Sequence, residues 1–138
     1  MTTVPAGGTT PEDQSAFMHL LGLSFEEVGP DLVVATFDAG PEHHQPWGIV
    51  HGGVFAAVIE TVASTGAYAA VKDRGQLAVG VTNITDFLRP HREGALRAVA
   101  EPVQRGKTQQ LWQVAIARED GKGVARGQVR LQNIEATE

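Results

Sequence analysis

Alternating apolar and polar residues mark the second half of the chain. Between positions 125 and 132, small or apolar residues alternate strictly with Arg and Gln. This period of two is typical of a strand with one covered face and one face in water. Comparable runs, bounded by Gly, Pro and Asp, predict six strands, at 23–28, 32–38, 77–89, 95–104, 109–118 and 123–134.

Short turn-forming segments join these strands. Gly, Pro, Asp and Lys recur in the joints, at 29–31, 90–94, 105–108 and 119–122. Connections this short favour antiparallel neighbours, so we expect a meander in which each strand pairs with the next. Ahead of the strands, residues 12–21 carry acids first and apolar residues later and precede Gly22, which predicts a short helix.

The segment 52–71 has the pattern of a helix that is buried on nearly all sides. Between His51 and Lys72 it holds six alanines, and its only charged residue is Glu60. Such a helix forms a core or spans a membrane. A carboxylate at mid-bilayer costs several kcal/mol, so we expect no membrane span. The predicted fold class is α+β, with an antiparallel sheet packed against this one long helix.

Composition fits one domain at 12–138 behind a flexible N-terminal tail at 1–11. The net charge of −5 argues against general binding of nucleic acid. The chain has no cysteine, which excludes disulfides, thiolate nucleophiles and zinc–cysteine sites. The first ten residues lack the basic and apolar regions of a secretory signal, so we expect a cytoplasmic protein.

Glu60 is the sharpest chemical feature. A carboxylate in an apolar helix must be paired, neutralised or used in chemistry. A basic partner or a solvent-facing helix edge would make it structural, whereas a desolvated site would suit a general base. Ser64 lies one turn later on the same face, where it can bond Glu60 or bond back to its own helix.

The tripeptide His51-Gly52-Gly53 stands where the loop becomes the helix. Unpaired N–H groups at a helix start, with the helix dipole behind them, can hold the developing negative charge of a carbonyl. A plain N-cap is the alternative. Gly52 and Glu60 are roughly 12 Å apart along one helix and turned about 80° from each other. If both act on one substrate, they must come from two chains of a dimer.

Other candidates are weaker. The histidines His43, His44 and His51 match no common metal-ligand spacing, so we expect no metal. Trp47 and Trp112 are interpreted as packing residues. Basic residues at the strand joints are either solvated turn charges or phosphate ligands; they are Arg89, His91, Arg92, Arg105 and Lys107.

With Gln45-Pro-Trp-Gly-Ile-Val-His-Gly-Gly53 placed before a helix that carries Glu60, the chain resembles the hotdog-fold acyl-CoA thioesterases from about residue 16 to 134. Within them it looks most similar to the glutamate-type 4-hydroxybenzoyl-CoA thioesterases and the 1,4-dihydroxy-2-naphthoyl-CoA hydrolases. The segments 87–94 and 111–116 are similar to that branch too.

This resemblance implies a sheet wrapped around the helix, homodimers with a continuous sheet, and dimers of dimers. It implies that Glu60 is the catalytic nucleophile or general base and that Gly52 polarises the thioester carbonyl. Gln45 would orient substrate or water, and Ser64 would supply a hydroxyl beside the carboxylate. The remaining expected substrate contacts are His51, Gly53, Phe87, Arg89 and Lys107. Where the naphthoyl-CoA hydrolases carry a histidine, this chain has Phe87, which predicts a differently lined acyl pocket.

The leading hypothesis is therefore hydrolysis of an acyl-CoA or aroyl-CoA without metal or cofactor, with Arg89 and Lys107 on the CoA phosphates. A non-catalytic acyl-CoA-binding module on the same fold is the alternative, because fold alone does not fix function. A hydratase acting on enoyl thioesters is disfavoured, since no acidic residue and histidine stand close together in a suitable loop.

Overall fold

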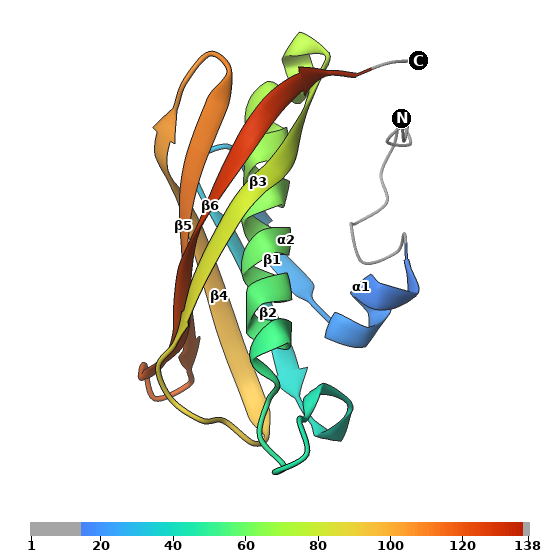
Figure 1. Ribbon diagram of the computed structural model, residues 1–138, viewed down its shortest axis with the longest axis vertical. Coiled ribbons are helices and arrows are strands. Elements are labelled where there is room, and N and C mark those ends of the chain that lie inside the picture. The colour runs from blue at the N-terminus through green and yellow to red at the C-terminus, as the bar shows by residue number, and fades with distance from the viewer. Residues whose placement is uncertain (1–14, 137–138) are drawn as a thin grey trace.

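The computed structural model describes residues 15–136. A six-stranded antiparallel sheet curves around one long helix (Figure 1). The helices are α1 (Ala16–Leu21) and α2 (Gly52–Val71), with short 3-10 turns at Pro41–His43 and Lys72–Arg74. The strands are β1 (Ser24–Val28), β2 (Val33–Ala39), β3 (Gln76–Phe87), β4 (Gly94–Arg105), β5 (Gln109–Arg118) and β6 (Gly123–Glu135). The expected α+β class and central helix are confirmed.

The strand order is β1-β2-β4-β5-β6-β3, so the expected meander is wrong at one strand. β3 pairs with β6 at the far edge of the sheet instead of with β4, the next strand in the chain. Three strand spacings, about 14 Å, separate β3 from β4. The connecting residues 88–93 can span about 20 Å. The connection is therefore long enough to cross the end of the sheet.

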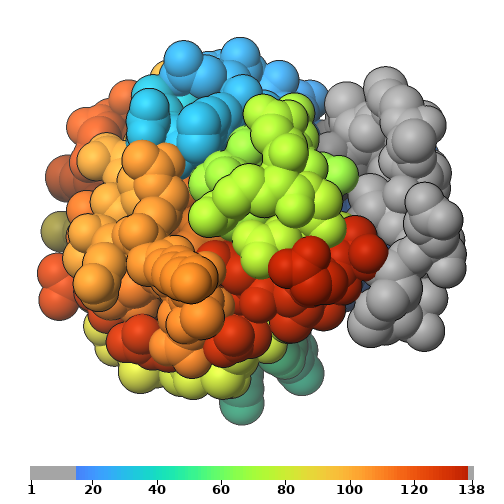
Figure 2. All heavy atoms as spheres, turned by 90° about the horizontal axis from the view of Figure 1, so that it is seen from above, coloured from blue at the N-terminus to red at the C-terminus, as the bar shows by residue number. Residues whose placement is uncertain are grey.

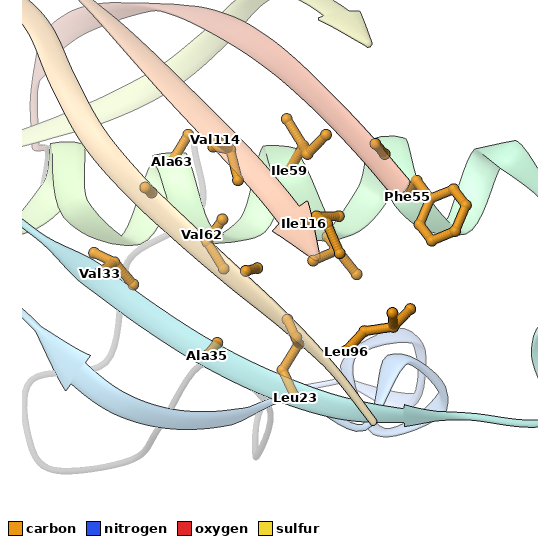
Figure 3. Packing of buried hydrophobic residues seen from close by; sticks show 14 of the residues in the cluster. Leu23, Val33, Ala35, Phe55, Ile59, Val62, Ala63, Leu96, Val114 and Ile116 are labelled. Atoms are coloured by element: carbon orange, nitrogen blue, oxygen red, sulfur yellow. The ribbon is translucent and has the colours of Figure 1, made fainter. Parts of the chain in front are cut away.

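Helix α2 fills the concave face of the sheet. Its buried side chains contact the inner faces of the strands, as the close view of Ile59, Val62 and Ala63 shows (Figure 3). By length and composition alone, the stretch Gly52–Arg74 is apolar enough to cross a membrane. Here it packs against the sheet with Val58 and Ile59 fully buried, so it is the core helix that the sequence predicts.

Helix α1 begins later than expected. Ser15 is its N-cap, and the Ser15 hydroxyl accepts a hydrogen bond from the Met18 N–H at 3.1 Å. A cap of this kind satisfies one of the free N–H groups of a first turn, which fixes the start at Ala16 rather than at residue 12. The predicted tail at 1–11 lies outside the described residues.

A buried polar network and a tight contact join the C-terminal half of α2 to the sheet. Gln110 donates from Nε2 to the Ala67 carbonyl at 3.1 Å, and its Oε1 accepts from the Trp112 indole at 2.8 Å. The Trp112 ring occupies the space where a Cβ on Gly66 would lie. Gly66 thus permits the close approach of α2 to β5.

Replacing Gly66 with alanine is expected to destabilise the protein by about 2 kcal/mol, the usual range for overpacking a core. Helix propensity alone predicts the opposite sign, a gain of up to about 1 kcal/mol. Urea unfolding of the native protein and Gly66→Ala measures the difference. A variant more stable than the native protein would show that Trp112 moves aside at little cost.

Candidate active site

A histidine ring caps the N-terminus of α2. His51 Nδ1 accepts a hydrogen bond from the Gly53 N–H at 2.7 Å. The Gly52 N–H has no hydrogen-bond partner among residues 15–136. The expectation of two open glycine N–H groups is therefore wrong for Gly53, which the cap occupies. Only Gly52 keeps an N–H at the positive end of the helix dipole that is free to bind a ligand oxygen.

Hydrogen bonds join the loop before α2 to the loop after β3 at this end of the helix. The Val50 N–H donates to the His91 carbonyl at 2.8 Å. His44 Nε2 lies 2.7 Å from the Arg92 carbonyl oxygen, and Arg92 Nη1 donates to the Gly48 carbonyl at 3.2 Å. The loop before α2 and the loop after β3 thus form one unit around the Gly52 N–H.

A cavity of about 320 Å³ opens beside this unit. Its lining includes Gln45, Gly52, Phe55, Phe87 and Arg89. The structure therefore brings the predicted orienting amide, the predicted carbonyl-binding N–H and the predicted acyl-pocket residue to one place. Gln45 Oε1 accepts from the Trp47 N–H, which holds the side chain in the turn.

The interpretation of the two tryptophans as packing residues holds for one of them. Trp112 is fully buried, but Trp47 is 80% exposed. Trp47 stands in a tight turn closed by the Gly48 N–H, which donates to the Gln45 carbonyl at 3.0 Å. The turn projects the indole away from the core.

Phe87 covers the N-terminus of α2 from the side. Its ring carbon Cζ lies 2.7 Å from where a Cβ on Gly52 would be. The ring packs against Phe55 at a centroid distance of 6.4 Å, and the Phe87 side chain is 60% exposed. We call Phe87 and Phe55 together the aromatic wall. Gly52, which has no Cβ, leaves the space that the Phe87 ring occupies.

The Glu60 carboxylate lies further along α2, against β3. Glu60 is half-buried and forms no ion pair within residues 15–136. Its Oε1 accepts a hydrogen bond from Asn83 Nδ2 at 3.0 Å. Its Oε2 lies 3.5 Å from the Ser64 hydroxyl, as the spacing of one helical turn predicts. A Cβ on Gly80 would overlap Oε2, so the glycine provides the room for the carboxylate.

Sequence reasoning missed Asn83, Thr85 and Gly80. Asn83 lies opposite Val129 in the β3–β6 pairing, and that residue is buried on the inner face of the sheet. Asn83 therefore points inward, because residues directly opposite each other share a face. Only the unexpected pairing of β3 with β6 reveals this, although a polar residue inside an apolar strand is a usable signal.

Comparison with known proteins assigns the chain to a family. The family model described as Thioesterase superfamily matches residues 48–125, more than half of the chain. The chain belongs to the thioesterase superfamily. Proofreading thioesterase EntH of Cronobacter turicensis is 35% identical over 102 residues, which cover 74% of this chain and 74% of that protein.

Solved structures agree with this thioesterase assignment. Rv1847 of Mycobacterium tuberculosis, named for an inferred esterase activity, superposes with a TM-score of 0.86 at 48% identity and covers 90% of this chain and 100% of its own. Thioesterase HI1161 of Haemophilus influenzae gives a TM-score of 0.84 at 30% identity, over 91% of this chain and 87% of its own. The hotdog fold expected from the resemblance is thereby confirmed.

The predicted phosphate ligands of this thioesterase lie at two ends of the sheet. Arg89 Nη1 donates to the Gly123 carbonyl at 2.8 Å, whereas the Lys107 carbonyl accepts from Asn133. Ten residues of β6, about 33 Å, separate those two positions. Figure 2 shows the β4–β5 turn, which carries Lys107, at the same end of the molecule as the C-terminal end of α2. Within one chain, Arg89 and Lys107 do not form one site.

A second hollow, of about 480 Å³, borders the cavity, and its lining holds Glu93 as well as three basic residues. His91, Arg92 and Arg118 line it. Arg118 is bound to Asp120 at 3.0 Å. The Lys122 backbone N–H and then the Arg118 guanidinium hold the pKa of Asp120 below its ordinary value. Arg118 is thus already paired, so His91 and Arg92 are the remaining basic groups of this hollow, next to Arg89 in the lining of the cavity.

His43 of this thioesterase has a structural role. No group of metal-binding residues occurs in the described part of the chain. His43 is buried, with Nε2 2.7 Å from the Leu20 carbonyl oxygen and Nδ1 accepting from the Gly40 N–H at 3.3 Å. Both ring nitrogens are therefore satisfied, and His43 fastens the end of α1 to the loop after β2.

Proposed function

We propose that this protein hydrolyses an acyl-CoA or aroyl-CoA thioester to a free acid and CoA. One observation supports this most: the half-buried Glu60 carboxylate has no cation partner among residues 15–136, is held by an amide on β3 and faces the gap left by Gly80. A carboxylate held in this way suits attack on a thioester or activation of water. The free Gly52 N–H supplies the donor for the developing oxyanion.

The reaction uses Glu60 in one of two ways. As a general base, Glu60 takes a proton from water while the water oxygen bonds to the thioester carbon. As a nucleophile, a Glu60 oxygen forms that bond and gives an anhydride, which water then opens. In both routes the carbonyl oxygen gains negative charge against the Gly52 N–H, the C–S bond breaks, and the CoA thiolate takes up a proton. Single turnover in H₂¹⁸O that labels the Glu60 carboxylate identifies the nucleophilic route with water attack at the Glu60 carbon of the anhydride, because the general-base route leaves Glu60 unlabelled.

The site is proposed to form between two subunits. Gly52 and Glu60 are eight residues apart on one helix, so one carbonyl does not reach both. A second α2, packed antiparallel across a two-fold axis, brings the partner's helix N-terminus to Glu60.

The two edges of the sheet indicate where the partner binds. β3 is a long edge strand with exposed apolar side chains, among them Val79, Val81 and Ile84. The opposite edge, β1, is short, carries adjacent glutamates and is interrupted by a bulge, features that discourage strand pairing. We therefore assign the dimer contact to β3. We also propose that two such dimers form a tetramer.

The first experiment measures CoA release from benzoyl, 4-hydroxybenzoyl, naphthoyl and straight-chain CoA thioesters with a thiol-reactive dye. The protein has no cysteine and adds no background. We expect turnover of at least one thioester by a protein that sediments as a dimer or tetramer. A folded protein that binds these thioesters without turnover would instead be an acyl-CoA-binding module.

The aromatic wall predicts a preference for aroyl groups, as in the glutamate-type branch that the sequence resembles. Phe87 and Phe55 offer ring contacts worth about 0.5–1.5 kcal/mol beyond buried area. Phe87→Leu is expected to lower kcat/KM for benzoyl-CoA about fivefold relative to hexanoyl-CoA. The ratio of the two substrates on one enzyme preparation cancels differences in active fraction. An unchanged ratio would place the acyl group elsewhere.

A further inference from the structure

Asn83 is the least expected polar residue around the candidate site. It lies on the edge strand β3 and points across to α2. Its Nδ2 donates to Glu60 Oε1 at 3.0 Å and to the Ala56 carbonyl at 3.1 Å. The two acceptors are one helical turn apart, so a single amide group binds both the catalytic carboxylate and the turn of α2 that carries it.

Thr85 sets the orientation of that amide. Its hydroxyl donates to Asn83 Oδ1 at 2.7 Å. An amide has one carbonyl oxygen and two N–H donors, and here the oxygen and both donors have partners. The flipped amide would place its oxygen against the Glu60 carboxylate and the Ala56 carbonyl, which are acceptors only. The Thr85 hydroxyl therefore contributes to keeping the N–H groups directed at Glu60.

The two oxygens of Glu60 are consequently unequal. Oε1 is held by Asn83, whereas Oε2 lies beside Gly80, with the Ser64 hydroxyl at 3.5 Å as its polar neighbour. A carboxylate anchored through one oxygen keeps the other at a fixed place and direction, and misplacement of a reacting group by 1 Å can cost about a hundredfold in rate.

We propose that Asn83 is the positioning residue of this active site, that Thr85 holds Asn83 in its working orientation, and that Oε2 is the reacting oxygen of Glu60. This inference rests on the proposed function, in which Glu60 is the catalytic carboxylate. In the general-base route, Oε2 receives the proton from water. In the nucleophilic route, Oε2 bonds to the thioester carbon.

The test is a set of variants assayed with the best CoA thioester. Asn83→Ala is expected to lower kcat about twentyfold with KM changed less than twofold, because the substrate still binds. Thr85→Val, which keeps the shape and removes the hydroxyl, is expected to lower kcat about fivefold, and Thr85→Ser restores it. Gln128→Ala is the matched control, because it truncates an exposed amide on the neighbouring strand β6 without changing kcat.

Double variants separate positioning from general damage. Because Thr85 acts through Asn83, the double variant Asn83→Ala/Thr85→Val is expected to match Asn83→Ala alone. Because Asn83 acts through Glu60, Asn83→Ala is expected to cost less than twofold in a Glu60→Ala background. Independent losses that multiply in either pair would overturn the inference, as would a native kcat in Asn83→Ala. If Asn83→Ala does not fold, Thr85→Val and Thr85→Ser decide alone.

A measurement without catalysis keeps this inference separate from the proposed function. The side-chain N–H₂ signals of Asn83 in ¹⁵N-labelled protein are expected to shift in both Glu60→Ala and Thr85→Val, and not in Gln128→Ala. If the native protein turns over no thioester but the variants show these shifts, the proposed hydrolysis and the catalytic role of Asn83 are both refuted. The contact between Asn83 and Glu60 is then still supported. Active native protein with unshifted signals would refute the positioning role alone.

Discussion

Replacing Glu60 with glutamine is expected to lower kcat by at least about a hundredfold and to leave the protein folded. Glutamine has nearly the shape of glutamate and keeps an oxygen that can accept from Asn83, so the contact at 3.0 Å can persist. The amide neither takes a proton from water at neutral pH nor attacks a thioester. Losing a general base typically costs about 10²–10⁴ in rate. The loss should appear in kcat, since the proposed role of Glu60 is in the transition state.

The assay compares kcat and KM for the best thioester, together with thermal unfolding. Glu27→Gln is the matched control, because Glu27 is an exposed carboxylate on β1, far from the site along the sheet order. Glu60→Ala is a second variant, in which the side chain beyond Cβ is removed. Turnover within threefold of native in both Glu60 variants would assign the chemistry to another group.

Local sequence signals account for the elements that were predicted best. The bounds of α2 and β5 agree with the structure residue for residue. Glycines and a capping histidine mark the start of α2, and a charged stretch beginning at Lys72 marks its end. Tight turns rich in Gly and Lys bracket β5. In each case the residues that decide the boundary lie within a few positions of it.

Long-range pairing was not predictable in the same way. The position of β3 beside β6 depends on how the sheet curves around α2. The residue types in the connection at 88–93 do not indicate which strand β3 pairs with. The same pairing decides which residues of β3 face the helix. Glu60 could therefore be singled out from its lone charge, whereas Asn83 and Thr85 became candidates only once β3 was placed. The exposure of Trp47 likewise depends on the direction of a loop rather than on residue type.

Replacing Gly80 with alanine is expected to lower kcat on the order of a hundredfold while unfolding stays close to native. A Cβ at this position would overlap Glu60 Oε2. Gly80 lies on the exposed edge strand, and its φ is not in the left-handed region, so the backbone accepts a methyl group without strain. The overlapped atom is the end of a flexible side chain, so the carboxylate moves and the strand does not.

The comparison of rate with stability makes this prediction specific. Gly29→Ala is the matched control, because the nearest atom to its Cβ position is 3.7 Å away and its φ is also outside the left-handed region. We expect both alanine variants to melt within about 3 °C of native, a shift that corresponds to less than about 1 kcal/mol in a chain of this size. A Gly80→Ala enzyme with native kcat would mean that Oε2 is not the reacting oxygen. A Gly80→Ala protein that loses rate only in proportion to its folded fraction would mean that Gly80 serves the fold rather than the position of the carboxylate.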